Sequence, residues 1–563
     1  MDFRKELLKA LSKAGIKKPE ELLEQPPQRE MGDYALPCFR LTKEFKKSPN
    51  EIASDFKEKI KLPKAFTKAE AKGPYLNFFL DEKTFAKNTI EKILKEKNAY
   101  GLEKKKGPKI IVEYCQANPM KAFHIGHIRN ICLGESISRI FEASGVNVSR
   151  VNYGGDVGPH VSKTLYAYQN LNKKKIPEKI EEKGAWLGNL YTQGAKAVKE
   201  NPELEQKMRD MVVELEAGNK KLVKDWEKLR KMSLGYFDTI YDSLNTKFDN
   251  IILESEVEKE GIKIAKQLQK EKFAYEDEGA LLVDLTKYNL EKFLVLKSDG
   301  AALYSTKDMA LAKMKKQKLK ADKTYNVVGS EQKFYFQQLI KTISLMNKKK
   351  NEFCETKHVS YELVRLEGGK MASREGNVIT YAELFNTIFE KTYKETKSRH
   401  KDWSEKKISE NAKQIGLAAI KFGMLGHDKN KVIIFNWEKA TSLEGETGPF
   451  IQYSYARAKS ILKKAKKTKP GSFSLTHEKE KGLVSILANY ENKVKEAKDS
   501  ISPHKIAYYL IELASAFNSF YHEVRVLDAE EKLIGDRVAL VESVSQVLQN
   551  GMDLLNIKAI DEM

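Results

Sequence analysis

Residues 109–155 constrain the fold more than any other part of the chain; they read KIIVEYCQANPMKAFHIGHIRNICLGESISRIFEASGVNVSRVNYGG. Ile110–Val112 is a continuous β-branched run, which is typical of a strand buried on both faces. A helical pattern follows, and VNVSRVNYGG has the pattern of a second strand. Strand, turn, helix and strand form a βαβ unit. The sequence therefore predicts a Rossmann-type parallel sheet.

The rest of the chain predicts further domains around this sheet. Charged amphipathic helical patterns follow the second strand, and short strand patterns return at 279–285, 293–300 and 323–330. We interpret these strands as part of the Rossmann-type sheet, which the helical insertion splits. Beyond about residue 385 the pattern is almost entirely helical and indicates a helix bundle. We predict a multidomain α/β protein, with these divisions: a small N-terminal α+β domain at 1–103, a Rossmann-type domain at 104–385 with a helical insertion at about 165–285, a helical connecting segment at 386–435, and an all-α helix bundle at 436–563.

Composition limits the function classes. Lys and Arg number 100 against 79 Asp and Glu, a net charge of +21, which favours a polyanionic partner. The four cysteines form no C-x-x-C pair, so a zinc ribbon or a disulfide framework is not expected. No apolar run approaches the roughly 18 residues of a transmembrane helix, and the charge-interrupted start does not read as a signal peptide. These features predict a reducing, cytoplasmic setting without a membrane.

The sharpest local feature is His124-Ile125-Gly126-His127, which opens the helix after the first strand. A helix N-terminus offers free N–H groups and a positive dipole, which suit phosphate. Gly126 removes a side chain where a nucleotide must approach. His124 and His127 lie three residues apart and so share one helical face, where both could grip a phosphate. The alternative is that one histidine caps the helix and the other packs in the core.

A second feature is the stretch from Lys370 to Asn377, KMASREGN, behind Gly368-Gly369. Flanking glycines give the backbone freedom to form a loop. Lys370 and Arg374 could stabilise a departing pyrophosphate. The alternative is an ordinary solvated turn.

Together, a HIGH sequence after the first strand and a KMxS loop roughly 245 residues later resemble the class I aminoacyl-tRNA synthetases, and the chain as a whole resembles the arginyl-tRNA synthetases. The similarity is spread along these blocks: MGDYALPCFRL, AKGPYLNFFLD, VEYCQANPMKAFHIGHIRN, VNYGGDVG, LYSTKDMALA, VVGSEQKFYFQQL, GGKMASREGNVIT, FNWEKATSLEGETGPFIQYSYARAKSIL and GMDLLNIKAIDEM. GETGPFIQYSYAR and the closing block are the most specific for arginine.

The resemblance implies an arginine–tRNA ligase. It would activate L-arginine with ATP to arginyl-adenylate, release pyrophosphate, and transfer arginine to the 3′ adenosine of tRNA(Arg). ATP would enter with Mg²⁺, and no structural metal is expected. The family default is a monomer, with 104–385 as catalytic domain, 436–563 as anticodon-binding domain and 1–103 touching the outer corner of the tRNA.

The resemblance also assigns residues to the ATP chemistry. Contacts to ATP and its transition state fall on His124, Gly126, His127, Lys121, Lys370, Met371 and Ser373. Ser373 stands where the wider class has a lysine. In arginine enzymes a lysine shortly before HIGH is thought to supply the missing charge, and Lys121 stands there. We hypothesise that Lys121 contacts the phosphates.

By the same resemblance the arginine pocket is lined by Glu113, Asn118, Tyr304, Asp308 and Gln332. A guanidinium is a planar fork of donors that suits carboxylates. Glu113 ends the first strand, where open α/β sheets bind ligands, and Tyr304 and Asp308 are four residues apart on one helical face. Glu113 could instead form a strand-edge salt bridge and Asp308 a solvated charge. The chain departs from the family where Tyr335 or Phe334 replaces a frequent histidine.

The resemblance also implies that Phe450, Gln452, Tyr453 and Tyr521 contact the anticodon. Three of these residues are aromatic, and single-stranded bases stack on aromatic rings; Gln452 is their polar neighbour. The alternative is that aromatics at helical spacing belong to the core. Three other functions stay open at this stage: a different class I synthetase, a small HIGH-type nucleotidyltransferase, and an RNA-binding paralogue without activation chemistry. The length and the C-terminal bundle disfavour the second.

Overall fold

A computed structural model describes residues 3–24, 26, 31–367, 379–465 and 468–563. Backbone proximity divides the chain into two compact units. The first unit holds Met1–Tyr100, Arg457–Asn489 and Leu513–Val547, and the second unit holds Gly101–Ala456, Tyr490–Glu512 and Leu548–Met563.

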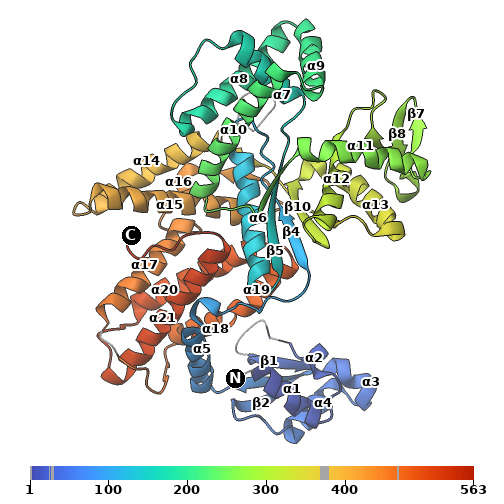
Figure 1. Cartoon of the computed structure of the whole chain (residues 1–563). Helices are drawn as coiled ribbons and strands as arrows, with labels where there is room; N and C mark the ends of the chain where they lie inside the picture. The colour runs from blue at the N-terminus through green and yellow to red at the C-terminus, as the bar shows by residue number, and fades with distance from the viewer. Residues whose placement is uncertain (1–2, 25, 27–30, 368–378, 466–467) are drawn as a thin grey trace. The chain divides into compact units, whose positions relative to one another are not determined.

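The second unit is built on a five-stranded parallel sheet in the order β11-β10-β4-β5-β6 (Figure 1). Its strands are β4 (Lys109–Glu113), β5 (Asn147–Gly154), β6 (Asn250–Leu253), β10 (Lys323–Gly329) and β11 (Glu355–Tyr361). Helix α6 (Ile125–Ala143) connects β4 to β5, and α13 (Lys333–Lys350) connects β10 to β11. The predicted βαβ unit and the Rossmann-type parallel sheet are thereby confirmed.

Helix α6 is buried almost all round, as expected of a helix at the centre of a domain. It packs against β4 and β5 and also against α15 (Glu405–Leu425) and α19 (Tyr490–Asp499). At Gly134 the helix approaches β4 so closely that an added Cβ would lie 2.1 Å from Cγ of Tyr114. Tyr114 is held there because its hydroxyl donates to the Glu135 carboxylate at 2.6 Å.

The side-chain amide of Asn130, buried in α6, ties this helix to the sheet. Its Oδ1 accepts the N–H of Cys115 at 2.7 Å, directly after β4. Its Nδ2 donates to the Val327 carbonyl of β10 at 2.8 Å and to the Tyr361 hydroxyl of β11 at 3.1 Å. A buried amide whose groups are all used fixes one register of helix and strands.

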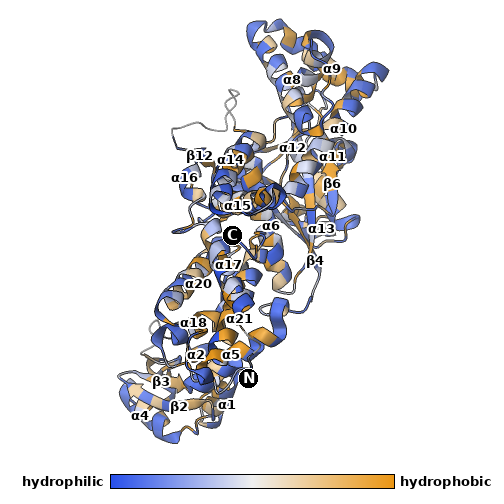
Figure 2. Cartoon of the chain, turned by 90° about the vertical axis from the view of Figure 1, so that its left-hand side faces the viewer, coloured by the Kyte–Doolittle hydropathy of each residue, from blue (hydrophilic) through white to orange (hydrophobic). Residues whose placement is uncertain are grey.

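The helical insertion is shorter than predicted. Helices α8 (Ile180–Glu200), α9 (Glu203–Glu216) and α10 (Lys220–Ser243) follow α7 (Pro159–Tyr166), and then β6 rejoins the parallel sheet. The insertion thus ends before residue 250, not at about 285. The four residues of β6 are too few to show a period in the sequence. Figure 2 shows hydrophilic and hydrophobic residues together along α8 and α9, as in amphipathic helices.

Two of the predicted strands lie outside the parallel sheet. Strands β7 (Tyr275–Asp277), β8 (Ala280–Val283) and β9 (Phe293–Leu296) form a separate antiparallel sheet. The expectation that 279–285 and 293–300 belong to the Rossmann sheet is therefore wrong. Short connections between these strands favour antiparallel pairing, since a parallel pair needs a long crossover.

Further elements complete the second unit. Helices α11 (Glu254–Lys270) and α12 (Tyr304–Gln317) pack against each other beside the parallel sheet. The predicted connecting segment holds strand as well as helix, because β13 (Ile433–Phe435) pairs in parallel with β12 (Val364–Leu366). The remaining helices are α14 (Tyr381–Arg399), α16 (Trp437–Ala440) and α17 (Gly448–Lys464), the last of which continues into the first unit.

The first unit contains the predicted small α+β fold. Strands β1 (Tyr34–Pro37), β2 (Phe66–Lys72) and β3 (Tyr75–Leu80) pair antiparallel in the order β1-β3-β2. Its helices are α1 (Phe3–Lys13), α2 (Pro19–Leu22), α3 (Thr42–Phe45), α4 (Pro49–Lys59), α5 (Glu82–Glu96) and α18 (Glu478–Ala488), with parts of α20 (His504–Glu523) and α21 (Glu531–Leu554). Leu7, Leu36 and Phe78 are fully buried in its core.

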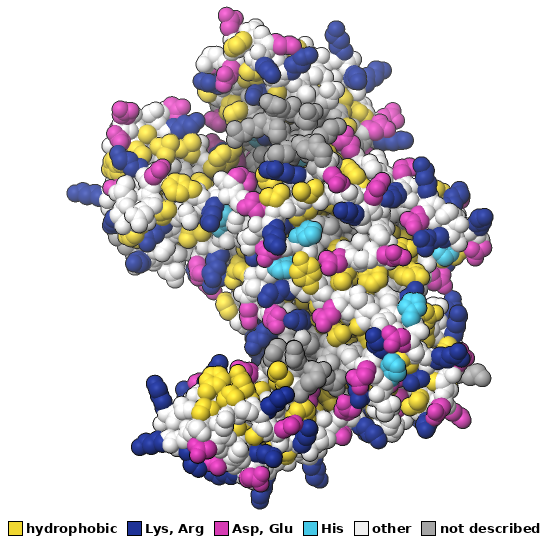
Figure 3. Space-filling view, turned by 180° about the vertical axis from the view of Figure 1, so that it is seen from behind, with side chains coloured by type: hydrophobic (Ala, Val, Ile, Leu, Met, Phe, Trp, Pro, Cys, Tyr) yellow, Lys and Arg dark blue, Asp and Glu magenta, His cyan; other side chains and the backbone are white. Residues whose placement is uncertain are grey.

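The surface carries both signs of charge. In Figure 3, Lys and Arg side chains are spread over the visible face, with Asp and Glu among them. No helix in the described part of the chain is both long and apolar enough to span a bilayer.

Gly134→Ala should reduce the free energy of unfolding by about 2–3 kcal/mol, since the new methyl group displaces the buried Tyr114 ring. Gly482→Ala is the matched control, because it also lies inside a helix but an added Cβ meets nothing within 4 Å. The control should gain about 0.5–1 kcal/mol. Denaturant unfolding of both variants measures the difference, and equal effects would contradict the close packing of α6.

Candidate functional site

The two histidines of the HIGH sequence are stacked at the start of α6. Nδ1 of His124 accepts the N–H of Gly126 at 3.1 Å, and Nδ1 of His127 accepts the N–H of His124 at 3.1 Å. The ring centroids lie 3.7 Å apart. A Cβ at Gly126 would lie 2.9 Å from Cε1 of His124, so glycine permits this stacking. His124 thus caps the helix, as the alternative interpretation had it.

Both imidazoles are neutral donors. Because each Nδ1 accepts a backbone N–H, the proton of each neutral ring resides on Nε2. Burial and, after it, the charge of Lys121 lower the pKa of His124 to about 4. Burial also lowers the pKa of His127 far below its usual value, with contributions from His124 and Lys121. Two Nε2–H groups at a helix N-terminus can donate to phosphate without carrying charge of their own.

Two lysines, Lys121 and Lys163, and the neutral His160 lie around this helix start. Together with the neutral His124 and His127 they make up what we call the cationic cluster, whose positive charge comes from the lysines. Burial lowers the pKa of Lys121, and Lys163 lowers it further. The Lys121 ammonium lies 5.4 Å from the ring centroid of Tyr191 in α8. Repulsion among cations is relieved when a polyanion binds, so the cluster fits a polyphosphate.

His160 links the cationic cluster to the neighbouring part of the site. Its Nε2 donates to the Gly155 carbonyl at 2.9 Å. Its pKa is lowered to about 4. Burial is the main cause, and the charges of Lys121 and, more weakly, of Lys307 act in the same direction. Lys121 precedes the HIGH sequence, whereas Lys307 pairs with Glu254 at 3.0 Å on the other side of the site. His160 therefore lies in the field of both.

The loop between β4 and α6 is strained. Cys115, Gln116 and Met120 have positive φ angles of 82°, 47° and 66°, which L-residues rarely adopt. Strain of this kind concentrates at functional sites. Asn118 secures the loop, because its Oδ1 accepts the N–H of Gly155 after β5 at 2.9 Å.

Glu113 ends β4 and forms the buried salt bridge that was the alternative for this residue. Its carboxylate lies 2.6 Å from the Lys315 ammonium of α12, and both side chains are almost fully buried. Nδ2 of Asn326 donates to its Oε1 at 2.9 Å. The negative charge of Glu113 is therefore largely neutralised inside the fold.

Asp308 is not a solvated helix charge. It lies in α12, and its Oδ2 accepts the Tyr335 hydroxyl at 2.6 Å. Burial raises the pKa of Asp308 to about 7; the bond from Tyr335 lowers it, and Glu113 raises it. Tyr304 lies one turn before and is 69% exposed. Gln332 is exposed in the turn after β10.

Two residues near Asp308, Tyr153 and Glu254, were not predicted from the sequence to belong to the site. The Tyr153 hydroxyl is buried and has no hydrogen-bond partner among the residues that the structure describes. Asp308 and then Glu254 add to burial in raising the pKa of Tyr153. Tyr153 lies in the VNYGGDVG block, which carries part of the family resemblance but in which no residue was predicted to bind a substrate. Glu254 directly follows β6, a strand that lies within the range predicted to be a helical insertion.

Lys370, Met371 and Ser373 lie outside the described residues. The chain that follows them is described, and it meets the start of α6. The Ile379 carbonyl accepts the N–H of Ile125 at 3.1 Å, and the N–H of Tyr381 donates to the Phe123 carbonyl at 2.8 Å. These two bonds flank His124 in the sequence.

The four anticodon candidates differ in exposure. Phe450 and Tyr453 are half-buried in α17 of the second unit, and Tyr521 is exposed in the first unit, where the Arg457 guanidinium lies 4.7 Å from its ring centroid. Gln452 is fully buried, and its Nε2 donates to the Lys558 carbonyl at 2.8 Å. Its Oε1 has no hydrogen-bond partner among the described residues, but burial of the whole side chain keeps it away from a base.

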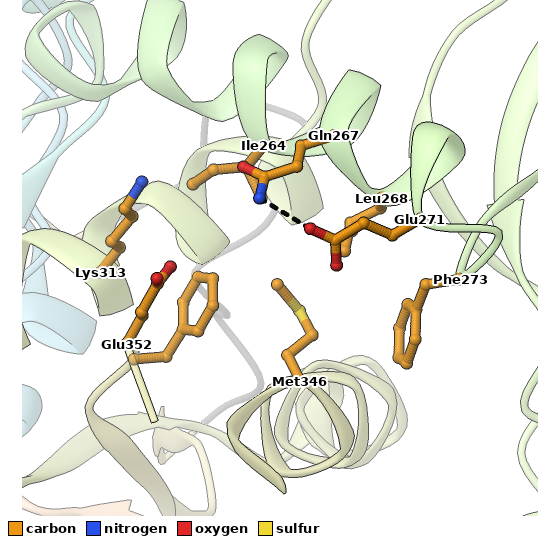
Figure 4. Close-up of a pocket in the computed structure, with 9 residues that line it drawn as sticks. Ile264, Gln267, Leu268, Glu271, Phe273, Lys313, Met346 and Glu352 are labelled. Atoms are coloured by element: carbon orange, nitrogen blue, oxygen red, sulfur yellow. Dashed lines mark hydrogen bonds between the residues drawn. The ribbon is translucent and has the colours of Figure 1, made fainter. Parts of the chain in front are cut away.

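A separate pocket lies between α11, α12 and α13 (Figure 4). Its floor is apolar, with Ile264, Phe273 and Met346, and Lys313 and Glu352 stand at its edge. It includes none of the predicted site residues. Within the described ranges, no three or more His, Cys, Asp or Glu side chains are grouped to hold a metal ion.

Three family models match consecutive parts of the chain. Residues 89–437 match the class I tRNA synthetase (R) catalytic domain, residues 451–563 the DALR anticodon binding domain, and residues 1–80 the arginyl tRNA synthetase N terminal domain.

Curated relatives and solved structures give the same result over the full length. Arginine–tRNA ligase of Clostridium perfringens is 36% identical over 574 residues, with all of both chains covered. That of Clostridium acetobutylicum is 35% identical over 577 residues, again with all of both chains covered. The arginyl-tRNA synthetase structure from Thermus thermophilus matches at a TM-score of 0.83 and 26% identity, covering all of both chains. That from Plasmodium falciparum, at 20% identity, shares the fold with a TM-score of 0.78 and covers 100% of this chain and 98% of its own.

The buried neutral histidines predict loss of stability in acid. The pKa of His160 is about 4 in the folded protein and about 6.5 when unfolded, so between these values only the unfolded chain takes up the proton. At about pH 5 this costs about 2 kcal/mol. In His160→Gln, the melting temperature should therefore fall less than in wild type between about pH 7.5 and about pH 5. Parallel thermal melts of the two proteins test this, and identical pH slopes would contradict it.

Proposed function

The chain belongs to the arginyl-tRNA synthetases, and from that premise we propose which of its residues carry the reaction. The enzyme activates arginine and charges tRNA in two steps. The arginine carboxylate attacks the α-phosphorus of ATP and pyrophosphate leaves; a ribose hydroxyl of the terminal adenosine then attacks the carbonyl carbon and AMP leaves. No protein nucleophile is needed, so the protein contributes positioning and charge stabilisation.

The ATP phosphates bind at the cationic cluster. Nε2–H of His124 and of His127 donates to phosphate oxygens, while Lys121 supplies a full charge from its place over Tyr191. Gly126 keeps the first turn of α6 narrow. The strongest support is that the nearby charges acting on these groups are cations, which a polyphosphate would neutralise.

The signature loop adds charge on the pyrophosphate side. This loop is the KMAS sequence, and by family resemblance we assign ATP contacts to its Lys370, Met371 and Ser373, all of which lie outside the described residues. Lys121 takes the role of the lysine that Ser373 replaces. This proposal is supported by the bond between Ile125 and Ile379, which brings the chain after the loop to the start of α6.

Arginine binds with its guanidinium at Asp308. This carboxylate is half-buried and, unlike Glu113, carries no ion pair of 4 Å or less among the described side chains. Glu113, with its charge shared with Lys315, contributes through its field. Asn118, Tyr304 and Gln332 complete the proposed binding residues. A half-buried carboxylate without an ion pair selects a cation, because a neutral ureido analogue leaves its charge uncompensated.

We assign tRNA binding to the two flanking regions. Residues 436–563 contact the anticodon, with Phe450, Tyr453 and Tyr521 as stacking candidates and Gln452 as a structural support. Residues 1–103 contact the outer corner of the tRNA, and 104–385 form the catalytic domain. The net charge of +21 supports binding of a polyanion.

ATP enters as its Mg²⁺ complex. Mg²⁺ keeps several waters and binds mainly through substrate phosphates, so a protein cage is not required. We propose that the enzyme acts in the cytoplasm and as a monomer. The monomer is supported because both parts of the proposed active site come from the second unit of one chain.

The most direct test of the activity is charging of a mixed tRNA pool with each amino acid. Arginine alone should be attached, and only to arginine tRNAs, because Asp308 demands a cationic side chain. Pyrophosphate exchange with the same amino acids should show the same selectivity when tRNA is present. Transfer of another amino acid would contradict the assignment.

Lys121→Ala should lower the rate of arginyl-adenylate formation on the order of a hundredfold, because one charge on the phosphates is lost. Lys207→Ala is the matched control, since the Lys207 ammonium also lies 5.4 Å from a tyrosine ring centroid but is exposed in α9. Pyrophosphate exchange with tRNA measures both. If the two variants keep equal rates, Lys121 does not compensate for Ser373.

Asp308→Asn should raise the KM for arginine on the order of a hundredfold and leave the KM for ATP unchanged, because a charged hydrogen-bond partner is removed. Asp284→Asn, at an exposed carboxylate after β8, is the control and should behave as wild type. Aminoacylation at varied arginine concentration measures both constants. An unchanged arginine KM would remove Asp308 from the pocket.

A further inference from the structure

Tyr335 is one of two neighbouring residues, with Phe334, where the chain departs from a frequent histidine of the arginine enzymes, and its hydroxyl is bonded to the proposed arginine pocket. It lies in the first turn of α13, and its hydroxyl donates to Oδ2 of Asp308 in α12 at 2.6 Å. The ring is held by aromatic contacts on two sides. Its centroid lies 5.5 Å from that of Phe336 and 5.9 Å from that of Phe293 in β9. The direction of the hydroxyl is therefore set by packing and not by the substrate.

Asp308 sits among ionisable groups from several elements: Glu113 of β4, Tyr153 of β5, Glu254 of α11, Tyr304, Lys307 and Lys315 of α12, and Tyr335 of α13. Burial is the largest influence and raises its pKa to about 7, and Glu113 and Glu254 act in the same direction. The bond from Tyr335 is the largest influence in the opposite direction, ahead of Lys315. The bond from this phenol therefore favours the ionised form of Asp308 against burial and the neighbouring carboxylates.

We propose that Tyr335 is a positioning and specificity-determining residue, which fixes the Asp308 carboxylate in one orientation and keeps it an anion for the substrate guanidinium. The inference rests on the assignment of Asp308 to the arginine pocket and adds a group that acts through it. An ionised carboxylate has about four lone-pair sites, and Tyr335 fills one on Oδ2. Oδ1 stays available for the N–H fork of the substrate.

Selectivity follows from the same bond. A protonated carboxyl group is a donor as well as an acceptor, so it can donate to the ureido oxygen of citrulline, whereas a carboxylate cannot. By holding Asp308 in the anionic form, Tyr335 favours arginine over its neutral analogue. A variant without the phenol should lose arginine affinity at mildly acidic pH and discriminate less against citrulline.

The test is the pH profile of kcat/KM for arginine in Tyr335→Phe, which keeps the ring and removes only the hydroxyl. kcat/KM reports the ionisation of the free enzyme. The acid limb of this profile should move to higher pH by about one unit in the variant. At pH values below the limb kcat/KM for arginine should therefore fall about tenfold relative to wild type, and above about pH 8.5 it should change little. The kcat at saturating arginine should change less than about twofold, because the reacting atoms are untouched. The ratio of citrulline to arginine dissociation constants should fall.

Two variants serve as controls. Tyr288→Phe removes the hydroxyl of another tyrosine that packs against the same core, and its profile should coincide with that of wild type. Tyr335→His restores an N–H donor, and its acid limb should stay near that of wild type or lie below it. This comparison also covers the case in which the phenylalanine variant folds poorly, which thermal melts would reveal.

The outcomes separate this inference from the assignment of the pocket. A loss in Tyr335→Phe that is equal at every pH, or no loss at all, overturns the inference. The same holds if the histidine and phenylalanine variants have the same limb. If Asp308→Asn itself leaves the arginine KM unchanged, the pocket assignment fails instead.

Discussion

The active-site end of the parallel sheet depends on one buried amide. Asn130 of α6 bonds to the backbone after β4, to the β10 backbone and to the last residue of β11. Each of these partners lies at the carboxyl end of a strand, where open α/β sheets bind ligands. An asparagine five residues after the N-terminal residue of α6 thus sets how the HIGH histidines lie relative to the sheet. The strained loop at Cys115–Met120 can persist because the surrounding hydrogen bonds over-determine it.

Around this fixed edge the site separates two kinds of charge. On one side two neutral imidazoles and Lys121 surround a helix N-terminus, and on the other Asp308 lies among carboxylates and phenols. The two substrates that we propose for these halves differ in charge in the same way: the triphosphate of ATP and the guanidinium of arginine. The reacting carboxylate and α-phosphate must meet between them. His160 lies where the fields of both halves overlap. Such preorganised charge is how an enzyme without a nucleophile can accelerate adenylate formation.

The sequence predicted those parts of the fold that depend on local patterns. The β-branched run at Ile110–Val112 and the helix that follows were enough for the βαβ unit. It did not predict interactions between distant segments. The salt bridge of Glu113 with Lys315 and the burial of Gln452 against Lys558 each depend on residues far away in the chain. Tyr335 was noticed only as a departure from the family, because its bond to Asp308 spans 27 residues.

The central claim is that the HIGH histidines and Asp308 belong to one site for one arginyl-adenylate. A structure of the enzyme with a non-hydrolysable arginyl-adenylate analogue tests it most directly. The account predicts that the phosphate mimic lies within hydrogen-bond distance of Nε2 of His124 or His127, and that the guanidinium lies equally close to Asp308. An analogue whose guanidinium pairs with another carboxylate, or whose phosphate mimic lies away from the start of α6, would contradict it.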